Sequence, residues 1–515
     1  MIKITSQNNI YQLFEQYFKS NIINHISDEF YQIYFVDIAK IRDISTFLNE
    51  KYFTLINISI LDYSKNFQLI YEFHSRLVKN SSFLFLILMI GNDDSINSIR
   101  HIYPQSRCYE NEIEKRYGLC FNSNNDSGYS ETLTIPHSLK SENKSKYFIP
   151  LGINNYNANI KNYINLFFNK NKITAIKEKT GWSYRGIIPL LQNKPFKENV
   201  ELTKRISFLG SFHHNLAYIM ALEKLCAIEV QSRVNQSRTI FCELERFENM
   251  LTWFINLFHL LNKEKISKKL MQNRLMFHQS LRKNLKIRFF DDINYIGYCH
   301  DFPNGDWLEF QNNLNDLAKN AINIIINSVY NTLLKKRCEN IGILTSEDAI
   351  NVGVTGPCIR ASGIAHDIRL ENPYLSYLNK DLIKRWNIVT SRNGDVHSRI
   401  ETRAWEMRNA IKIINHLITH LIDDDEEIIV FDDKNLILPK NLISIMQVES
   451  PQGELTYYLK TSESGDPSIL AGASICSPSL KNFLALNDYL LKNASKSNFK
   501  LIVHSMDLNF NEIDL

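Results

Sequence analysis

Cysteine is sparse and unpaired in this chain of 515 residues. Its eight cysteines stand far apart, and no C-x-x-C pair occurs. This excludes a zinc ribbon and a thioredoxin-like motif, and it argues against a cysteine-ligated iron–sulfur cluster of the common spacings. Scattered, unpaired cysteines are typical of proteins of the reducing cytosol.

Long hydrophobic runs are missing as well. The longest, Phe83–Ile90, is far shorter than the ~20 apolar residues that a membrane helix needs. The N-terminus also lacks the pattern of a signal peptide. We therefore expect no direct membrane span, and any membrane role must come through partners.

Neither a strong charge imbalance nor a phosphate-binding glycine motif is present. The net charge of +4 is too small to indicate a nucleic-acid-binding protein, and we expect no dense basic stripe. Neither G-x-x-x-x-G-K-S/T nor G-x-G-x-x-G occurs in the chain. The residues therefore give no support for nucleotide or NAD binding by the chain itself.

The chain has enough apolar residues, 44%, to form two or three domains with large cores. Residues 8–20 and 92–102 have helical patterns. Four apolar runs of strand length lie between short polar connectors, at Tyr31–Ile38, Phe53–Leu61, Phe67–Phe73 and Phe83–Ile90. We predict an α+β domain over residues 1–121, followed by a linker rich in Asn, Ser and Lys over residues 122–146.

Residues 147–515 are predicted to be mainly helical, with short strands at the ends of this domain, so that the fold class is α+β. Apolar residues recur with a helical period in Gln236–Leu261 and Arg399–Leu421. Long helices with apolar stripes predict a helical bundle. Strands are predicted at Ile428–Ile437, Leu455–Lys460 and Leu501–Val503.

The segment Gly356–Tyr374 carries the most informative motif, GPCIRASGIAHDIRLENPY. It resembles the G-P-x-x-R-A-S-G-x-x-x-D-x-R-x-x-x-P-Y/F signature of one superfamily. That superfamily holds the large subunits of nickel-iron hydrogenases, mainly the membrane-bound energy-converting type, and the 49-kDa-type subunit of complex I. The resemblance implies a hydrogenase-large-subunit-like fold over residues 147–515.

The segment Pro104–Gly118 resembles the P-x-A-x-x-x-E-R-E-x-x-D-x-x-G segment of the 30-kDa-type subunit of complex I. An ordinary amphipathic acidic helix is the alternative interpretation of this segment alone. Its position upstream of a 49-kDa-like region favours the family interpretation, because the two subunits are fused in some complex I enzymes and in formate-hydrogenlyase-type large subunits, which are similar to hydrogenase-4 component G.

Further matches to the large-subunit family extend to the C-terminus. In the E-S/A-P-R-G-E-L motif, Gln452 replaces the arginine. The matching segments are Gly181–Gly186, Lys204–Tyr218, Glu243–Arg246, Gly394–Arg399, Glu449–Leu455, Ser477–Ser479 and Ser505–Asp514.

The resemblance places other residues where hydrogenases carry four metal-binding cysteines. Ser207 and Gly210 occupy the first pair of positions, and Asn509 and Glu512 occupy the second. Nickel and low-spin iron need soft thiolate ligands, which these residues cannot supply. We therefore expect no metal and no cofactor to be bound by this chain, and no hydrogenase activity.

The same resemblance leaves quinone binding open. Complex I uses a histidine in an N-terminal hairpin and a tyrosine on the following helix as donors to the quinone. The corresponding hairpin, Ile149–Tyr156, has no histidine, and Phe208 stands at the tyrosine position. Phe208 has no hydroxyl donor. Tyr156, Tyr184, His213 and His214 remain as alternative donors, and the sequence does not select among them.

Three charged residues complete the list of pocket candidates: Arg360, Asp367 and Asp507. For Arg360 and Asp367, a buried salt-bridge network is favoured over a role in the pocket. For His213 and His214, a core position is favoured over proton transfer. For His416 and His420, a solvated helix face is favoured over a zinc site.

The resemblance implies an electron-transfer subunit of a complex-I-like or hydrogenase-4-like membrane complex. It would work through an iron–sulfur cluster in a small partner subunit and lie on the inner face of the cell membrane through membrane-arm subunits. The alternative is a non-catalytic scaffold that couples such a complex to an ion-translocating membrane arm.

Overall fold

The computed structural model describes residues 8–27, 31–63, 66–75, 83–91, 94–103, 106–122, 146–150, 163–169, 171–179, 183–423, 429–462, 465–491 and 494–515. The chain forms two compact units. The first combines Met1–Lys144 with Glu347–Val354, and the second combines Ser145–Ser346 with Thr355–Leu515. The return of Glu347–Val354 to the first unit was not foreseen from the sequence.

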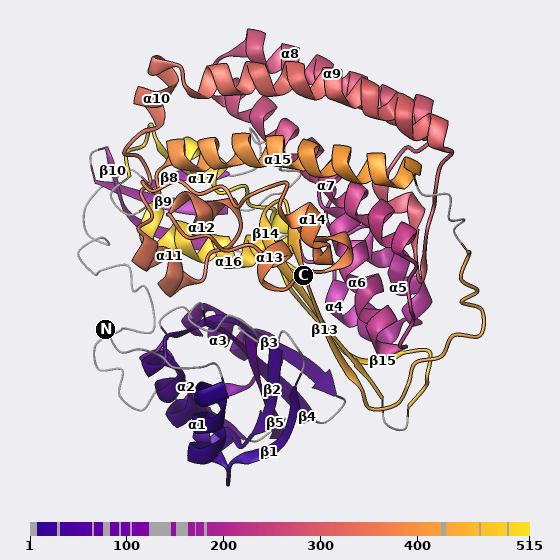
Figure 1. Ribbon diagram of the computed structural model, residues 1–515. Coiled ribbons are helices and arrows are strands. Elements are labelled where there is room, and N and C mark those ends of the chain that lie inside the picture. The colour runs from indigo at the N-terminus through magenta and orange to yellow at the C-terminus, as the bar shows by residue number, and fades with distance from the viewer. Residues whose placement is uncertain are drawn as a thin grey trace. The chain divides into compact units, whose positions relative to one another are not determined.

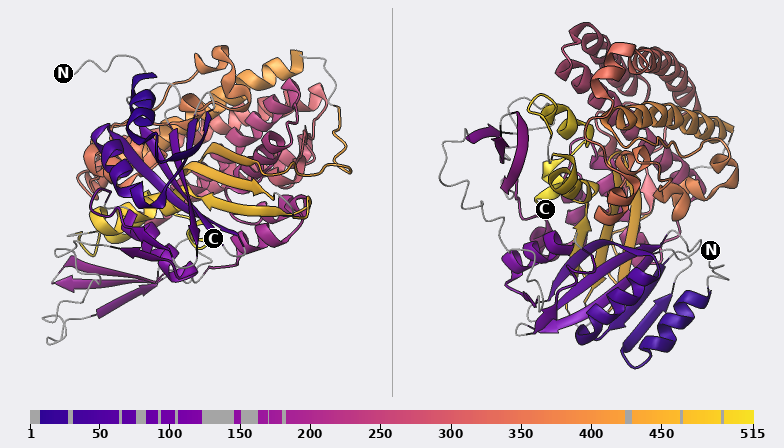
Figure 2. Two further views of the ribbon diagram at one scale, coloured as in Figure 1. Left: turned by 90° about the horizontal axis from the view of Figure 1, so that it is seen from below. Right: turned by 90° about the vertical axis from the view of Figure 1, so that its left-hand side faces the viewer.

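A five-stranded sheet forms the centre of the first unit (Figures 1 and 2), with the strand order β1-β2-β5-β4-β3. Its side chains on β5 are buried almost throughout, as expected for a central strand with both faces covered. The strands are β1 (Ile22–Ser27), β2 (Tyr31–Val36), β3 (Phe53–Tyr63), β4 (Asn66–Ser75) and β5 (Phe83–Gly91), so all four predicted runs form strands.

The helices of the first unit are α1 (Asn8–Phe18), the short η1 (Ile38–Lys40), α2 (Ile41–Glu50), α3 (Ser106–Tyr117) and α11 (Ser346–Val352). The first residue of α11, Ser346, belongs to the second unit. Helix α1 confirms the prediction for residues 8–20. The predicted helix at 92–102 is wrong where it is described, because β6 (Ser95–Asn97) pairs in parallel with β7 (Cys120–Asn122). Pairing with a strand that is distant in sequence therefore determines the conformation of this short segment.

The second unit is built on four long helices that pack together as a bundle (Figure 1): α7 (Ser232–Leu260), α8 (Glu264–Asn284), α9 (Asn304–Val329) and α15 (Val396–Asp423). Helices α7 and α15 confirm two predictions. Helix α7 is buried on nearly all sides, because α8 and α15 and the short η4 (Leu375–Leu378) pack around it. Within the described ranges, no helix has both the length and the apolar character needed to cross a bilayer.

A three-stranded antiparallel sheet of β13 (Ile443–Ser450), β14 (Gly453–Thr461) and β15 (Leu470–Cys476) lies near the C-terminus, where Figure 2 shows it in yellow. The predicted strand at 455–460 is therefore confirmed. Helix α6 (Ser211–Leu225) packs on β13 and β14. The last elements are α16 (Pro478–Ala485), a π-helical turn (Leu486–Leu490), α17 (Phe499–Ser505) and α18 (Phe510–Ile513).

Two predicted strands near the C-terminus are wrong. Residues 501–503 lie in α17. The prediction failed because an apolar triplet is too short to distinguish a buried strand from a buried helix. Residues 429–437 are irregular, and residue 428 lies outside the described ranges. Ile429, Val430 and Ile437 stay exposed, so this apolar run has no sheet or core to bury it.

The remaining elements of the second unit are short. They are β8 (Lys146–Pro150), β9 (Tyr163–Asn169), β10 (Lys172–Lys179), α4 (Ile187–Asn193), α5 (Phe196–Thr203), η3 (Phe290–Ile293), β11 (Asn294–Tyr295), β12 (Tyr298–Cys299), α10 (Thr332–Cys338), α12 (Pro357–Ala361), α13 (Ile368–Glu371) and α14 (Lys380–Ile383). Strands β8–β10 form a second three-stranded sheet.

Candidate functional site

The four positions that the resemblance aligns with metal-binding cysteines come together in space. The amide Nδ2 of Asn509 donates to Ser207 Oγ at 2.7 Å and to Glu512 Oε1 at 3.0 Å. A Cβ atom on Gly210 would lie 3.1 Å from Ser207 Oγ and 3.7 Å from Glu512 Oε1. Ser207 and Gly210, just before α6, therefore form one polar cluster with Asn509 and Glu512, at the start of and within α18, and we call it the Asn509 cluster.

Further hydrogen bonds connect the Asn509 cluster to the side chains around it. Ser479 Oγ donates to Glu512 Oε2 at 2.8 Å and accepts from the backbone N–H of Asn509 at 3.0 Å. His214 Nε2 lies 3.6 Å from Glu512 Oε1, and its Nδ1 is 2.9 Å from the hydroxyl of Tyr457. Burial and the nearby Glu512 raise the pKa of Tyr457 well above its usual value, so the phenol stays protonated.

This donor set does not fit a nickel-iron centre. The groups at the four positions are a hydroxyl, a glycine, an amide that turns its N–H toward the centre, and a carboxylate. Such a centre needs thiolates that are soft and deprotonated, and an amide N–H cannot ligate a cation.

We expect the purified chain to contain far less than one nickel per molecule after growth in nickel-supplemented medium. Asn509 Nδ2 already satisfies the two oxygen atoms at the cluster's centre. Elemental analysis of the intact chain measures this directly. A stoichiometric nickel content that resists chelation would show that other groups complete a metal site there.

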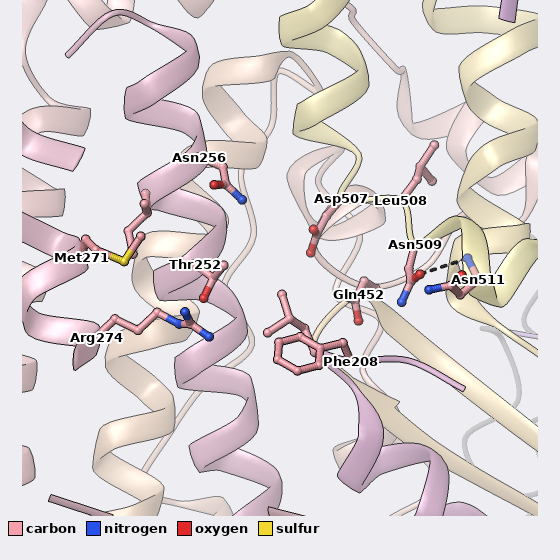
Figure 3. A pocket seen from close by; sticks show the side chains of 12 residues that line it. Phe208, Thr252, Asn256, Met271, Arg274, Gln452, Asp507, Leu508, Asn509 and Asn511 are labelled. Atoms are coloured by element: carbon pink, nitrogen blue, oxygen red, sulfur yellow. Dashed lines mark hydrogen bonds between the residues drawn. The ribbon is translucent and has the colours of Figure 1, made fainter. Parts of the chain in front are cut away.

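A cavity of about 230 Å³ lies beside the Asn509 cluster, between α7, α8 and the segment that joins α17 to α18 (Figure 3). Sequence reasoning identified Phe208, Asp507 and Asn509 as site residues, and all three line this cavity. It did not single out the wall residues from α7 and α8, because core-forming helices give no local signal of a cavity. The remaining lining residues are Leu209, Thr252, Ile255, Asn256, Met271, Arg274, Gln452, Leu508 and Asn511.

The cavity wall offers polar atoms that the described part of the chain leaves without hydrogen bonds. They are Thr252 Oγ1, Gln452 Oε1, Asp507 Oδ2 and Arg274 Nε. The other end of the Arg274 guanidinium is held by Glu248, with Nη2 2.7 Å from Glu248 Oε1. Because buried polar groups normally find partners, these atoms favour a polar ligand or ordered water in the cavity.

Gln452 lines the cavity and stands where two motifs make a close contact. Gly356 begins the signature segment with a φ of 67°, and a Cβ atom there would clash with the carbonyl oxygen of Gln452. Glycine permits both the left-handed backbone and the approach. The signature segment and the turn between β13 and β14 therefore pack directly against each other.

Asp507 is a buried acid in a left-handed backbone conformation. Its φ is 53°, a conformation that glycine, asparagine and aspartate adopt more readily than other residues do. Burial raises its pKa to about 6, with Glu512 adding to the shift and Arg403 opposing it. Arg403 Nη2 is 3.9 Å from Asp507 Oδ2, too far for a direct hydrogen bond.

Arg360 and Asp367 lie in a buried ionic cluster and do not line the cavity. Arg360 Nε is 2.5 Å from Glu406 Oε1, and Nη1 is 2.8 Å from Glu449 Oε1 and 3.3 Å from Asp367 Oδ2. Arg369 binds Asp367 through two nitrogens, at 2.9 and 2.7 Å. Burial alone would raise the pKa of Asp367, but Arg369 and Arg360 hold it well below its usual value.

Two of the other candidate donors, His213 and Tyr184, do not line the cavity. His213 is fully buried, with Nδ1 2.5 Å from Glu245 Oε2, and burial lowers its pKa although Glu245 opposes the shift. Tyr184 is about half exposed. Tyr156 lies outside the described residues, and so does most of the hairpin region at 149–156. His416 and His420 stack edge to face with ring centroids 4.4 Å apart.

Family models match two segments of the chain. Residues 34–137 match the respiratory-chain NADH dehydrogenase 30 Kd subunit, and residues 270–445 match the respiratory-chain NADH dehydrogenase 49 Kd subunit. The order of the two matches along the chain is that of the predicted fusion.

Curated relatives support the second match. The D-type subunit of NADH-quinone oxidoreductase from Dehalococcoides mccartyi is 28% identical over 355 residues, which cover 66% of this chain and 91% of the relative. The protein of the same name in Trichlorobacter lovleyi is 26% identical over 377 residues, covering 66% and 92%.

A solved structure has the same fold over much of the chain. It belongs to the membrane-bound sulfane sulfur reductase (MBS), an archaeal respiratory membrane complex. The TM-score is 0.63 at 24% sequence identity, and the match covers 72% of this chain and 98% of the other. From these matches, the chain is a fusion of complex I 30-kDa-type and 49-kDa-type domains and a homologue of the D-type subunits of NADH-quinone oxidoreductases.

Proposed function

We propose that this chain is a peripheral-arm subunit of a membrane-bound respiratory complex that transfers electrons through a cluster held by a partner. The homologues are NADH-quinone oxidoreductase subunits. Three of the four positions that the resemblance aligns with hydrogenase thiolates carry oxygen and nitrogen groups that bond to one another, and the fourth is Gly210. Electrons must therefore come from a cofactor of another subunit, and we propose a small iron–sulfur subunit in this role.

The cavity beside the Asn509 cluster is the proposed acceptor site. This is the observation that carries the proposal, because the cavity combines apolar walls from Leu209, Ile255 and Leu508 with unpartnered polar atoms. Small-molecule sites commonly have this composition. A quinone headgroup fits it in chemical terms, since its two carbonyl oxygens accept hydrogen bonds and its ring is apolar.

The hydrogen-bond donors in this cavity differ from those of complex I. Phe208 stands at the position that the resemblance aligns with the quinone-binding tyrosine, and the residue is 75% exposed where it lines the cavity. Arg274 Nε and Asp507, when it is protonated, can donate in place of the missing hydroxyl. We therefore propose that Arg274 and Asp507 orient the acceptor.

The rim of the cavity is the proposed docking face for the iron–sulfur subunit. Phe208 and Met271 are both exposed and both line the opening. Exposed apolar side chains around a functional cavity are typical of protein interfaces. In the assembled complex the chain would be held at the inner face of the cell membrane by its partners.

The proposal is tested on the complex isolated from its native membranes through a tag on this chain. We expect an iron–sulfur subunit to co-purify and its cluster to be re-oxidised when a water-soluble quinone is added. Thr252→Leu places a larger side chain in the cavity, and the hydroxyl that it removes makes no hydrogen bond within the described part of the chain. It should raise the quinone KM at least tenfold while the cluster is still reduced normally.

The matched control is Thr419→Leu, at an exposed threonine of α15. It should leave the KM unchanged. If a complex assembles without any iron–sulfur subunit, or if Thr252→Leu and the control behave alike, the electron-transfer proposal fails. Assembly without electron transfer would instead favour the scaffold alternative, in which the chain only links the complex to its membrane arm.

A further inference from the structure

Positive charge is concentrated in one stretch of the chain. Residues 263–288 contain nine lysines and arginines and a single acidic residue, Glu264, which gives this stretch a net charge of +8. Since the whole chain carries +4, the other residues together carry −4. The expectation that no dense basic stripe exists is therefore wrong, because acidic residues elsewhere hide the stripe in the total charge.

Most of the stretch forms helix α8, and the helix presents its basic residues other than Arg274 to solvent. The side chains of α8 that are buried, such as Leu270, Phe277 and Leu281, recur at the helical period and pack toward α7 and α9. Lys265, Lys268 and Lys269 are exposed. Figure 1 shows α8 and α9 as the outer pair of the bundle, so this face of α8 has no helix of its own unit over it.

Few of these charges are neutralised within the described part of the chain. Arg274 pairs with Glu248, and Lys283 pairs with Glu309. Among the described residues, no ion pair within 4.0 Å is formed by Lys265, Lys268, Lys269 or Arg282. Unpaired lysines repel one another along a helix, so an anionic partner would stabilise them.

Two apolar side chains protrude among the lysines. Leu275 is 56% exposed and Met276 is 52% exposed. They lie near the middle of α8, with Lys268 and Lys269 about two turns before them and Arg282 and Lys283 about two turns after them. A row of flexible basic side chains with an apolar centre is the composition of a helix that lies on an anionic membrane surface.

We propose that the exposed face of α8 docks on anionic lipid headgroups. The positive face is about 27 Å long from Lys265 to Lys283 at 1.5 Å per residue, which allows several headgroups to bind at once. A nucleic acid would not use Leu275 and Met276, whereas the boundary between headgroups and acyl chains takes up such side chains. The residues that carry this proposal, Lys265, Lys268, Lys269, Leu275 and Met276, do not line the cavity, so this inference does not depend on the identity of the acceptor.

The test measures binding of the full-length chain to vesicles by co-sedimentation. We compare vesicles of neutral phosphatidylcholine with vesicles that contain about one-third phosphatidylglycerol. We expect binding only to the anionic vesicles, and a loss of at least tenfold in affinity between low and high salt, because the attraction falls off within a Debye length.

A triple variant, Lys265→Gln, Lys268→Gln and Lys269→Gln, removes three of the charges. Each basic side chain near an anionic surface strengthens binding about fivefold, so we expect at least a tenfold weaker affinity. The matched control is the triple variant Lys335→Gln, Lys336→Gln and Lys384→Gln, which removes three exposed lysines of α10 and of the end of α14. It should bind as the wild type does.

A second variant tests the apolar centre. Leu275→Gln with Met276→Gln should weaken binding about threefold or more and leave the salt dependence unchanged, because the charges remain. Equal binding to neutral and anionic vesicles would overturn the proposal, and so would equal weakening by both lysine triples. If the wild type ignores both kinds of vesicle, the proposal is wrong, and an acidic protein surface becomes the better occupant of this face.

Discussion

Arg360→Lys should destabilise the chain strongly, by about 3 kcal/mol. The guanidinium is fully buried and contacts Glu406, Glu449 and the carbonyl oxygen of His366 at 2.5 to 2.9 Å. An ammonium cannot reproduce this planar arrangement. Each buried acceptor that loses its donor costs ~1–3 kcal/mol, and breaking a buried ion pair costs ~3–5 kcal/mol.

Thermal and denaturant unfolding of the full-length chain measure this effect. Arg282→Lys, at an exposed position of α8, is the control, and it should cost less than about 0.5 kcal/mol. Equal melting temperatures for the two variants would show that the Arg360 contacts contribute no net stability.

Unlike Arg360→Lys, Asp507→Asn should increase the stability of the folded chain above neutral pH. Burial raises the pKa of Asp507 to about 6, and the unfolded chain has an ordinary carboxyl pKa of ~3.9. The stability that the protonated carboxyl contributes is present below that unfolded value and is lost as the pH rises through 6. At pH 8 the ionised Asp507 therefore costs up to ~3 kcal/mol.

Asparagine removes the charge and accepts the left-handed backbone conformation at this position. The gain in stability should be largest at pH 8, shrink between pH 7 and pH 4, and vanish below pH 4. Melting curves over this range test the sign, and the exposed Asp292→Asn is the control. A variant that is less stable than the wild type at pH 8 would show that the Arg403 contact outweighs the cost of burial.

In the isolated complex, the same substitution should lower electron transfer to the acceptor. Asp507 lines the cavity with an unpartnered Oδ2, which favours a role in ligand contact over a role in folding. A stabilising change that impairs activity is common at binding sites, because such sites hold groups in unfavourable states.

The sequence was sufficient to predict the features that depend on a long repeating pattern of apolar residues or on a motif. The central strands of the first sheet are continuous apolar runs, and α7 and α15 carry long stripes of helical period. Patterns of this length reflect burial directly. The presence of Ser207, Gly210, Asn509 and Glu512 at positions that the resemblance aligns with thiolates is likewise visible in the residues alone, and it predicts that the chain holds no nickel-iron centre.

The remaining features of the fold and of the candidate site depend on contacts between segments that are distant in sequence. The cavity needs α7 and α8 to face the segment around Asp507, and the Asn509 cluster needs hydrogen bonds that join residues 207 and 509. The strand β6 depends on pairing with β7, and the exposed basic face of α8 depends on which side α7 and α9 cover. No local pattern predicts these features, because each depends on two segments that come into contact only when the whole core packs.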